Sequence, residues 1–584
     1  MFDLLVKNGL VVDGTGAQAK HADIAVSEGR VAEIAPPGSI AGSAGRVIDA
    51  TDLAVCPGFV DIHTHYDAQA FWDPTLSPSP LHGVTTVVGG NCGFSIAPLT
   101  GDADDADYLM RMLARVEGMP LESLQQGLRW DWRSTEDFFD RLDSTLGPNA
   151  AFMVGHSALR RAVMHDAAVG SQATPEQLDA MKGLLRKGLA AGAIGFSSTW
   201  SRTHNDHNGD PVPSRHATSD ELVELCSVVG EFPGTTLEFI PAPPPFEESN
   251  FELMAAMSRA ANRPINWNVL AVYSRNAEVV ERQLAGSDLA RGLGGRVVAL
   301  TLPDSQRNRL NFKSGFILDI LPGWDKLMAL PDTEKLTMLA DPIGRLRMDE
   351  LAQSQEGPLR SIANWGQYLI VETFDAKSRP FIGRPVADFA AEIGKSAWDA
   401  LAEMVVADEL KTVIVNQDRG QDVESWRRRV DVWRDHRAVV GASDAGAHLD
   451  MIDTFNYTTT VLAKAVREHG LLSLEEAVSH LTGGPAGLYG LTGRGVISEG
   501  AWSDLVVFDP ERIGPSPVST RYDLPGGAGR VFGGSVGIHE VVVAGEVIVE
   551  DGTFSDARPG RILRSGRDTA TVPVRPLTGS ENAA

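Results

Sequence analysis

Short apolar runs that alternate with helical segments constrain this chain more than any other feature of its sequence. Eight runs have the length and the β-branched content of buried strands, and helical segments lie between most of them. The runs span residues 59–65, 84–92, 150–156, 193–198, 235–240, 264–269, 297–302 and 438–444. Since alternating strands and helices build parallel sheets, eight such units predict an α/β chain folded as a (β/α)8 TIM-like barrel.

The clearest helix signal lies between the third and fourth runs. Thr174 is a good N-cap residue, a proline follows it at the first helical position, and Gln177 can complete a capping box. This helix is expected to extend to Gly192, which suits a C-cap. Residues 303–437 are too long for a single crossover. We therefore expect a helical insertion there, with an extra strand-like run at 368–372.

Both ends of the chain carry hairpin patterns instead of the alternation of its middle. Apolar segments flank Asn8-Gly9 and Glu28-Gly29 near the N-terminus, and similar runs return from about residue 490. We expect one small β-domain built from both ends, with the barrel inserted between them. The expected limits are 1–57 and 486–560 for the two halves of this β-domain, 58–485 for the barrel, and 561–584 for a mobile tail.

The composition of the chain restricts which partners and which cellular location we expect for the protein. The formal net charge of −25 opposes binding to nucleic acid or to an anionic membrane surface, so we expect neither as a partner. Only three cysteines are present, and the N-terminus lacks the charged and apolar segments of a signal peptide. No run of 18 apolar residues occurs. A cytoplasmic protein is expected, and a homo-oligomer stays open.

The most informative chemical feature is the pair His63 and His65 at the end of the first run. Residues two apart on a strand face the same way, so both imidazoles can converge on one point, as two metal ligands must. A His-x-His pair alone is weak evidence for a metal. Its place at the carboxyl end of a predicted barrel strand, where such barrels have their active sites, strengthens the case.

Two further residues end predicted strands at the same barrel face. Cys92 ends the second run and Asp444 ends the eighth. Taken alone, Cys92 would be a small buried residue and Asp444 a turn residue or helix N-cap. Together with the histidine pair they form a plausible zinc-type donor set, because zinc binds imidazole, thiolate and carboxylate. We therefore predict a metal site holding one or two divalent ions.

Other histidines receive different predictions. His156 ends the third run, and we expect it to contact substrate or to support a ligand instead of binding metal. His204, His207 and His216 lie in a polar stretch after the fourth run. That cluster is predicted to form a rim loop.

Several motifs resemble the amidohydrolase superfamily. The segment Pro57–Asp67, with its His-Thr-His core, resembles the start of that superfamily. The segment Gly83–Pro98, which contains Gly-Gly-Asn-Cys-Gly, is more specific and is similar to the N-acyl-D-amino-acid deacylase (D-aminoacylase) branch. Further likeness lies at residues 3–16, 155–160, 192–197, 443–444 and 500–508. The resemblance thus extends over nearly the whole chain.

The resemblance implies roles for four residues and a fold for the two ends. It implies that His63, His65 and Cys92 are metal ligands, and that Asp444 is the catalytic acid and base, able to contact metal as well. It also implies a β-sandwich made from both chain ends. The family places further metal-binding histidines at the ends of strands 5 and 6. Here Glu238 stands at the first place, and Trp267 or Asn268 at the second.

The family also has cationic residues after those histidines, which hold a substrate carboxylate. Here Ile240 follows on strand 5, and Val269 or Leu270 follows on strand 6. A buried carboxylate without a cation costs on the order of several kcal/mol. We therefore expect a pocket for apolar or uncharged groups near Phe239, Ile240, Trp267 and Leu270. Arg160 is the alternative cation if a carboxylate is bound after all.

These observations lead to one predicted function and two alternatives. The prediction is a metal-dependent hydrolase of amide bonds in a small molecule. The ion is expected to be Zn²⁺, with Mn²⁺ or Co²⁺ as alternatives if Glu238 is an oxygen ligand. Candidate substrate-binding residues are His156, Arg160, Trp267 and Asn268. The alternatives are a hydrolase of lactones, esters or cyclic amides on the same fold, and a ligand-binding relative without catalysis.

Overall fold

A computed structural model of the 584-residue chain describes residues 1–305, 307–315, 317–354, 358–416 and 420–574. Parallel strands occupy the middle of the chain, and each of the eight predicted runs overlaps at least one. In order they are β6 (Phe59–Asp61), β7 (Val84–Gly89), β8 (Asn149–Phe152) with β9 (Val154–Gly155), β10 (Gly195–Thr199), β11 (Thr236–Ile240), β12 (Ile265–Leu270), β13 (Val297–Thr301) and β17 (Ala438–Val440). The mixed α/β class is therefore confirmed.

These strands follow one another around a ring. Strands β6, β7 and β8 form one parallel sheet, and β9 to β13 with β17 form another. The single residue Met153 separates β8 from β9, which links the two sheets. A parallel bridge between Thr64 and Ala445 joins the segments that follow the first and last strands. All carboxyl ends of the strands therefore lie at the same end of the ring.

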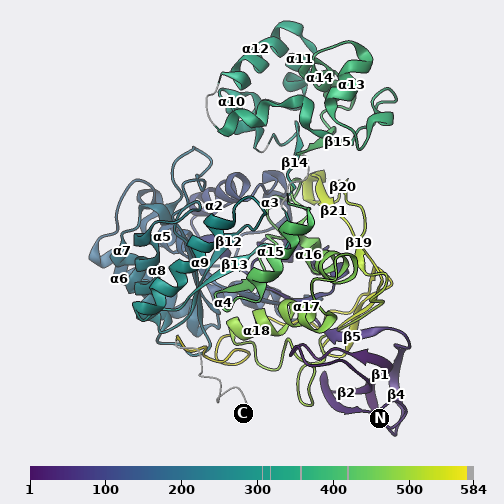
Figure 1. The fold of residues 1–584 in the computed structure, drawn as a ribbon. Helices are drawn as coiled ribbons and strands as arrows, with labels where there is room; N and C mark the ends of the chain where they lie inside the picture. The colour runs from purple at the N-terminus through teal and green to yellow at the C-terminus, as the bar shows by residue number, and fades with distance from the viewer. Residues whose placement is uncertain (306, 316, 355–357, 417–419, 575–584) are drawn as a thin grey trace.

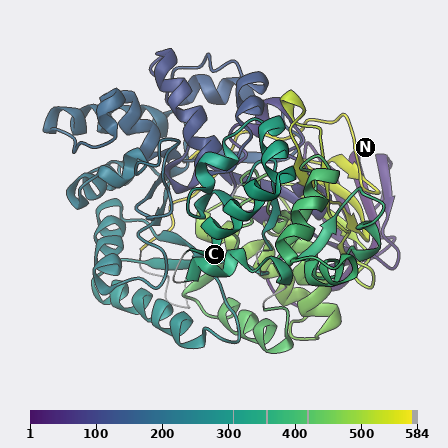
Figure 2. The same cartoon turned by 90° about the horizontal axis from the view of Figure 1, so that it is seen from above.

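Helices pack around the outside of this ring (Figures 1 and 2). They are α5 (His156–Met164), α6 (Pro175–Ala190), α7 (Ser219–Val229), α8 (Glu248–Ala261), α9 (Ala277–Gly292), α15 (Val423–Trp433), α17 (Leu474–Leu481) and α18 (Gly483–Tyr489). Helices α2 (Ala103–Val116), α3 (Leu121–Gly127) and α4 (Thr135–Leu142) lie between β7 and β8 in the chain. Helix α6 has the predicted start, because the Thr174 and Gln177 side chains form both bonds of the capping box.

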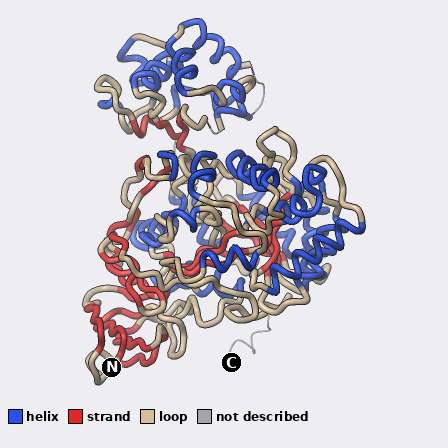
Figure 3. The backbone as a smooth tube through the Cα atoms, turned by 180° about the vertical axis from the view of Figure 1, so that it is seen from behind, coloured by secondary structure: helices blue, strands red, loops and turns tan. Residues whose placement is uncertain are grey.

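The two ends of the chain meet in one nine-stranded sheet, seen as red strands near the N-terminus in Figure 3. Its strands are β1 (Phe2–Val11), β2 (Lys20–Ser27), β3 (Arg30–Ala35), β4 (Ala44–Asp49), β5 (Ala54–Pro57), β18 (Leu505–Phe508), β23 (Ile538–Val543), β24 (Glu546–Glu550) and β25 (Thr553–Phe554). Antiparallel pairing of β5 with β18 joins the N-terminal strands to the C-terminal ones.

One predicted hairpin in this sheet is wrong. The segments on either side of Asn8-Gly9 form the single strand β1, whose pairing with β2 shifts register between Val6 and Gly9. Asn8 adopts a left-handed conformation, with φ of 64°, and its backbone N–H donates to the Asp23 carboxylate at 2.8 Å. The asparagine thus marks a bulge, a feature that asparagine and glycine suit as well as they suit a turn.

An insertion with its own hydrophobic core rises above the ring (Figure 1). It contains α10 (Trp324–Met328), α11 (Asp332–Ala340), α12 (Pro342–Gln353), α13 (Val386–Ile393) and α14 (Ala397–Ala407), with strands β14 (Arg309–Asn311), β15 (Leu369–Glu372) and β16 (Val413–Val415). Strand β15 corresponds to the extra strand-like run predicted from the sequence. Asn311 donates to the Asp450 carboxylate at 2.8 Å, beyond the end of β17. The insertion therefore contacts the ring at the carboxyl end of its strands.

The prediction of a mobile tail needs correction over the residues that the structure describes. Residues 561–574 pack against the ring, with Ile562 and Leu563 fully buried. Ile562 forms a parallel bridge with Ala150, and Arg564 forms an ion pair with Asp143 at 2.6 Å. The arginines and glycines of this segment suggested mobility, but the buried Ile562 and Leu563 anchor it. Residues 575–584 lie outside the described part of the chain.

One property concerns membranes. Over the described ranges, no helix is both long and apolar enough to cross a bilayer.

Candidate metal centre

The His63–His65 segment lies clamped between two neighbours at the carboxyl end of β6. Thr64 donates its backbone N–H to Val88 on the β7 side, and His65 donates to Ala445 beyond β17 at 2.7 Å. A Cβ atom on Gly446 would lie only 2.6 Å from the His65 carbonyl carbon, so glycine permits this close approach. The two imidazoles lie with ring centroids 5.3 Å apart and are almost fully buried. They converge, as the two-residue spacing predicted.

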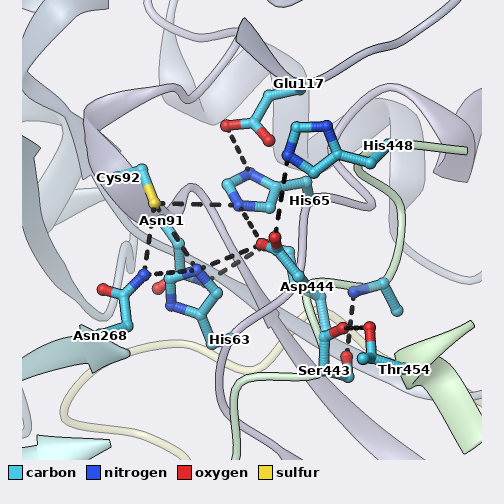
Figure 4. A network of polar contacts seen from close by, with 12 residues as sticks. His63, His65, Asn91, Cys92, Glu117, Asn268, Ser443, Asp444, His448 and Thr454 are labelled. Atoms are coloured by element: carbon cyan, nitrogen blue, oxygen red, sulfur yellow. Dashed lines mark hydrogen bonds and ion pairs between the residues drawn. The ribbon is translucent and has the colours of Figure 1, made fainter. Parts of the chain in front are cut away.

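Potential metal donors gather around the two imidazoles (Figure 4) in two groups that share His65: His63, His65 and Cys92 form one, and His65, Glu117 and Asp444 form the other. The Sγ atom of Cys92 lies 3.6 Å from His63 Nε2 and 3.9 Å from His65 Nε2. On the other side of the pair, Asp444 Oδ1 lies 3.6 Å from His63 Nε2 and 3.1 Å from His65 Nε2. Bonds of about 2.0–2.3 Å to one ion place neighbouring donors roughly 3–4 Å apart. The His63, His65 and Cys92 donors therefore fit a divalent metal ion, and Asp444 lies close to both imidazoles.

Cys92 reaches this position through an unusual backbone conformation. It lies in the 3-10 turn η2 (Asn91–Gly93) after β7, with φ of 56°. Its backbone N–H donates to Glu238 Oε2 at 2.8 Å, and Asn91 fixes the turn by donating to the Thr64 and Val88 carbonyls. Burial raises the pKa of the Cys92 thiol well above its usual value. A coordinated cation overcomes this effect, because metal binding deprotonates a thiol outright.

Asp444 is the donor that solvent can reach. Its side chain is 32% exposed, whereas His63 and His65 are 1% and 2% exposed. Burial would raise the pKa of Asp444, but hydrogen bonds from His63 and His65 hold it well below its usual value. Asp444 is therefore an ionised carboxylate on the open side of the donor group.

The sequence interpretation missed two residues beside the donors, Glu117 and His448. Glu117, at the carboxyl end of α2, places Oε1 3.6 Å from His65 Nδ1. Burial alone would lower the pKa of His65, but Glu117 and Asp444 raise it to about 9. His448 Nε2 lies 4.0 Å from Asp444 Oδ2, and its backbone N–H donates to the Glu117 carbonyl. No local pattern predicts these contacts, since Glu117 lies far from both partners in the chain.

Glu238 and Asn268 lie near the ends of strands 5 and 6, where the family resemblance implies histidines, and both lie on the Cys92 side of the donors. Asn268 is the residue that faces the donors, with Nδ2 3.2 Å from His63 Nε2 and 3.7 Å from Cys92 Sγ. Glu238 is completely buried, and burial raises its pKa to about 8. Its oxygens are absent from the groups of described His, Cys, Asp and Glu donors that lie within 4.8 Å of one another. The structure thus places Glu238 behind Cys92, and its predicted role as a metal ligand stays a prediction.

Three predicted substrate residues have other partners. Trp267 is fully buried, and its ring packs 4.6 Å from Phe246, away from the donors that Asn268 faces. His156 and Arg160 are buried as well, and both bind the Glu221 carboxylate, at 2.8 Å and 2.6 Å. Substrate contact by these three residues stays a prediction. A charged side chain that is buried needs a partner, and here Glu221 provides it.

The polar stretch after β10 forms part of the rim, and none of its histidines belongs to the grouped donors of the described chain. His204 Nδ1 lies 2.9 Å from Thr199 Oγ1, and burial lowers the pKa of His204 to about 3. His207 packs against Tyr108, and His216 bonds to the Pro211 carbonyl.

A cavity of about 450 Å³ lies beside the donors, without including them. Its lining comes from residues before and after Glu117 in the sequence, from residues of the insertion, and from residues within the segment 520–529. Asp450, two residues from His448, also lines it. The insertion therefore encloses space on the Glu117 side of the centre.

Comparison with known proteins identifies the family of the chain and several relatives. The profile of the amidohydrolase family matches residues 46–311 and 376–549. D-aminoacylase of Alcaligenes xylosoxydans xylosoxydans is 28% identical over 571 residues, which are 96% of this chain and 97% of that protein.

Two solved structures cover 97% of this chain and 100% of their own, each at 26% identity with a TM-score of 0.63. One is an N-acyl-D-glutamate deacylase from Bordetella bronchiseptica, in complex with zinc and a phosphonate that mimics the tetrahedral intermediate. The other is a D-aminoacylase with a binuclear metal centre, in which one metal activates and the second attenuates.

Proposed function

The chain belongs to the amidohydrolase family, whose members of this kind hydrolyse carbon–nitrogen bonds other than peptide bonds, and we propose that it cleaves uncharged amides of small molecules. The observation that carries the proposal is the group of two imidazoles and a thiol at the carboxyl ends of the ring strands, with the Asp444 carboxylate close to both imidazoles. We regard the ring as a catalytic (β/α)8 barrel with this centre at its mouth.

His63, His65, Cys92 and Asp444 would hold the metal, and their nitrogen and sulfur atoms favour Zn²⁺. When bound, a divalent ion supplies Lewis-acid chemistry that polarises an amide carbonyl and lowers the pKa of water. Asp444 is ionised and reachable, so it can accept the proton of the attacking water at a carboxylate oxygen. It can then deliver that proton to the leaving nitrogen. His448, near Asp444 Oδ2, lies on the same side.

The surroundings of the centre support an uncharged substrate. Where the family resemblance implies cations that hold a carboxylate, this chain has Ile240 on β11 and Val269 or Leu270 on β12. Among the polar contacts identified for the donors in the described chain, none involves a lysine or an arginine. Arg160 is engaged with Glu221. Placing a carboxylate here without a cation would cost on the order of several kcal/mol.

The proposal is tested by comparing an N-acetyl-D-amino acid with its carboxamide, in protein loaded separately with Zn²⁺, Mn²⁺ and Co²⁺. We expect a higher kcat/KM for the carboxamide, because it presents no negative charge to the pocket. Lactones and esters of similar size, assayed in parallel, test whether the cleaved bond is an amide. A clear preference for the free carboxylate would contradict the substrate class, and hydrolysis of lactones alone would contradict the bond.

A further inference from the structure

One imidazole on the rim of the centre has a ring nitrogen that is open to a bound molecule. His204 Nδ1 lies 2.9 Å from the hydroxyl oxygen of Thr199, the last residue of β10. In the part of the chain that the structure describes, its other nitrogen, Nε2, has no hydrogen-bond partner and is not among the fully buried polar atoms. The residue as a whole is half-buried. Solvent therefore reaches Nε2, which leaves this atom available to a ligand.

The hydrogen bonds of Thr199 show which ring nitrogen of His204 carries the proton. Thr199 is completely buried, and its hydroxyl oxygen accepts the Ser201 backbone N–H at 3.1 Å. The single hydroxyl proton then needs an acceptor, and among the described residues His204 Nδ1 is the one within bonding distance. Because a buried hydroxyl without an acceptor is costly, Thr199 donates to Nδ1. Nε2 therefore carries the ring proton and is a hydrogen-bond donor.

The His204 ring is neutral and lies near the metal donors. Burial lowers the pKa of His204 to about 3. The charge of Asp444 raises this pKa, while the charges of His448 and His65 lower it, so all three lie near enough to act on the ring. The ring also packs against Phe94, directly after η2, with ring centroids 5.2 Å apart. His204 thus borders the same open space as Asp444.

The loop that carries His204 is held firmly in place. Arg215 donates to the His204 carbonyl at 3.0 Å and to the Asn205 side chain at 2.6 Å. Asp206 accepts the Tyr108 hydroxyl at 3.0 Å, which ties the loop to α2. A donor that is fixed before the substrate arrives needs no reorganisation during the reaction, and this makes its hydrogen bond more effective in stabilising developing charge.

We propose that His204 binds the substrate, and that its Nε2–H donates a hydrogen bond to the carbonyl oxygen of the scissile amide. This oxygen gains negative charge as water attacks the carbonyl carbon, so a donor beside it stabilises the transition state more than the ground state. A neutral imidazole can polarise a carbonyl in this way without giving up its proton. Asp444 accepts the proton of the water, and His204 transfers none. The inference rests on the proposed function, since it assigns a residue to that reaction.

Two substitutions separate the roles of the two ring nitrogens. Glutamine places its amide nitrogen near the position of Nε2, whereas asparagine reaches only the position of Nδ1. In Zn²⁺-loaded protein acting on an N-acetyl-D-amino acid carboxamide, we expect His204→Asn to lower kcat about 10²–10³-fold and His204→Gln to recover about a tenth or more of the wild-type kcat. His207→Asn is the matched control, because this exposed histidine packs against Tyr108 and should leave kcat unchanged.

A binding measurement tests the same contact without turnover. Methylphosphonate has oxygens arranged as in a tetrahedral intermediate, and isothermal titration calorimetry measures its affinity for the Zn²⁺-loaded protein. His204→Asn should weaken binding about 10–100-fold, as expected when a hydrogen bond to a charged acceptor is lost, and His204→Gln should restore much of the affinity. The Zn²⁺ content of each variant, measured by mass spectrometry of the metal, should equal that of the wild type.

Three results would overturn the inference. Wild-type kcat and methylphosphonate affinity in a folded His204→Asn protein would show that Nε2 makes no contact with the substrate. A His204→Gln protein as impaired as His204→Asn would show that the N–H at this position is not the group that matters. Loss of Zn²⁺ from His204→Asn would place the role of His204 in metal binding. Circular dichroism establishes folding, and His204→Phe, which keeps a ring against Phe94 without an N–H, repeats the test if the asparagine variant does not fold.

The two measurements separate the inference from the proposed function. If the wild type cleaves no amide, the proposed function fails, while weaker methylphosphonate binding by His204→Asn still supports the contact assigned to His204. If amides are cleaved and neither measurement changes in His204→Asn, only the inference fails. A wild-type protein that cleaves no amide and binds no methylphosphonate contradicts both.

Discussion

Glu117 offers a sharp test of the metal centre, because it touches a ligand without being required to touch the ion. Its Oε1 lies 3.6 Å from His65 Nδ1, on the ring edge opposite Nε2, the atom that faces Cys92 and Asp444. A carboxylate in this place fixes the ring orientation and makes the imidazole a stronger ligand. Glu117→Gln keeps the shape and an acceptor oxygen, but removes the negative charge.

The expected magnitude follows from this distance. A full charge pair at 3.6 Å would gain about 4.6 kcal/mol at an effective dielectric of 20. When His65 binds metal its ring carries only part of a positive charge, so only part of this energy applies. Removing such an outer carboxylate typically weakens metal binding about 10–100-fold, which is about 1.4–2.7 kcal/mol. We expect Glu117→Gln to fall within that range.

The assay is competition between the protein and a chelator of known affinity for Zn²⁺, followed by the metal content of the protein at each chelator concentration. Glu136→Gln is the matched control, since this exposed glutamate starts α4 and should leave affinity unchanged. The argument would be refuted by a folded Glu117→Gln protein with an affinity within a factor of about two of the wild type.

The remaining predictions concern the donors themselves. His63→Ala or His65→Ala should abolish metal retention and activity together, because each buried imidazole faces both Cys92 and Asp444. Full metal content after dialysis of the double variant would contradict the assignment of both residues as ligands. Asp444→Asn should lower kcat about 10²–10⁴-fold with a smaller change in substrate binding, because an amide cannot carry the proton. Steady-state kinetics at saturating metal measure kcat and KM. A near-normal kcat would mean that another group moves the proton.

Much of the ring could be predicted because its strands are buried on both faces. Strands of this kind form short continuous apolar runs, and each predicted run overlaps an observed strand. The convergence of His63 and His65 could be predicted for a related reason. Their two-residue spacing places both on one side of an extended segment, whatever surrounds it.

Other features depend on contacts that sequence spacing does not encode. Glu117 meets His65 only because α2 ends beside the ring, and that packing is a tertiary property. The choice between Trp267 and Asn268 depended on the register of β12, which the apolar run alone leaves open. Arg160 binds Glu221, 61 residues away, a partner that the spacing of the sequence did not indicate.

The backbone around the donors is strained and is held in place by hydrogen bonds across the site. Cys92, Asp444 and His448 all have left-handed φ values, of 56°, 60° and 46°. Such conformations cost of order 1–3 kcal/mol each and persist only where neighbours hold them. In each case the strained residue's own N–H is held across the site: Cys92 by the Glu238 carboxylate, Asp444 by the His63 carbonyl, and His448 by the Glu117 carbonyl.

Glu238 shows what this clamping means for the altered strand ends. Its carboxylate keeps the Cys92 turn aimed at the histidines, so the sulfur stays a usable donor even where the neighbouring strand offers an asparagine. Replacing Glu238 by a residue without an acceptor would release a buried N–H, at a cost of about 1–3 kcal/mol, and would free the turn to relax. A residue behind a predicted ligand can therefore determine whether that ligand is correctly placed.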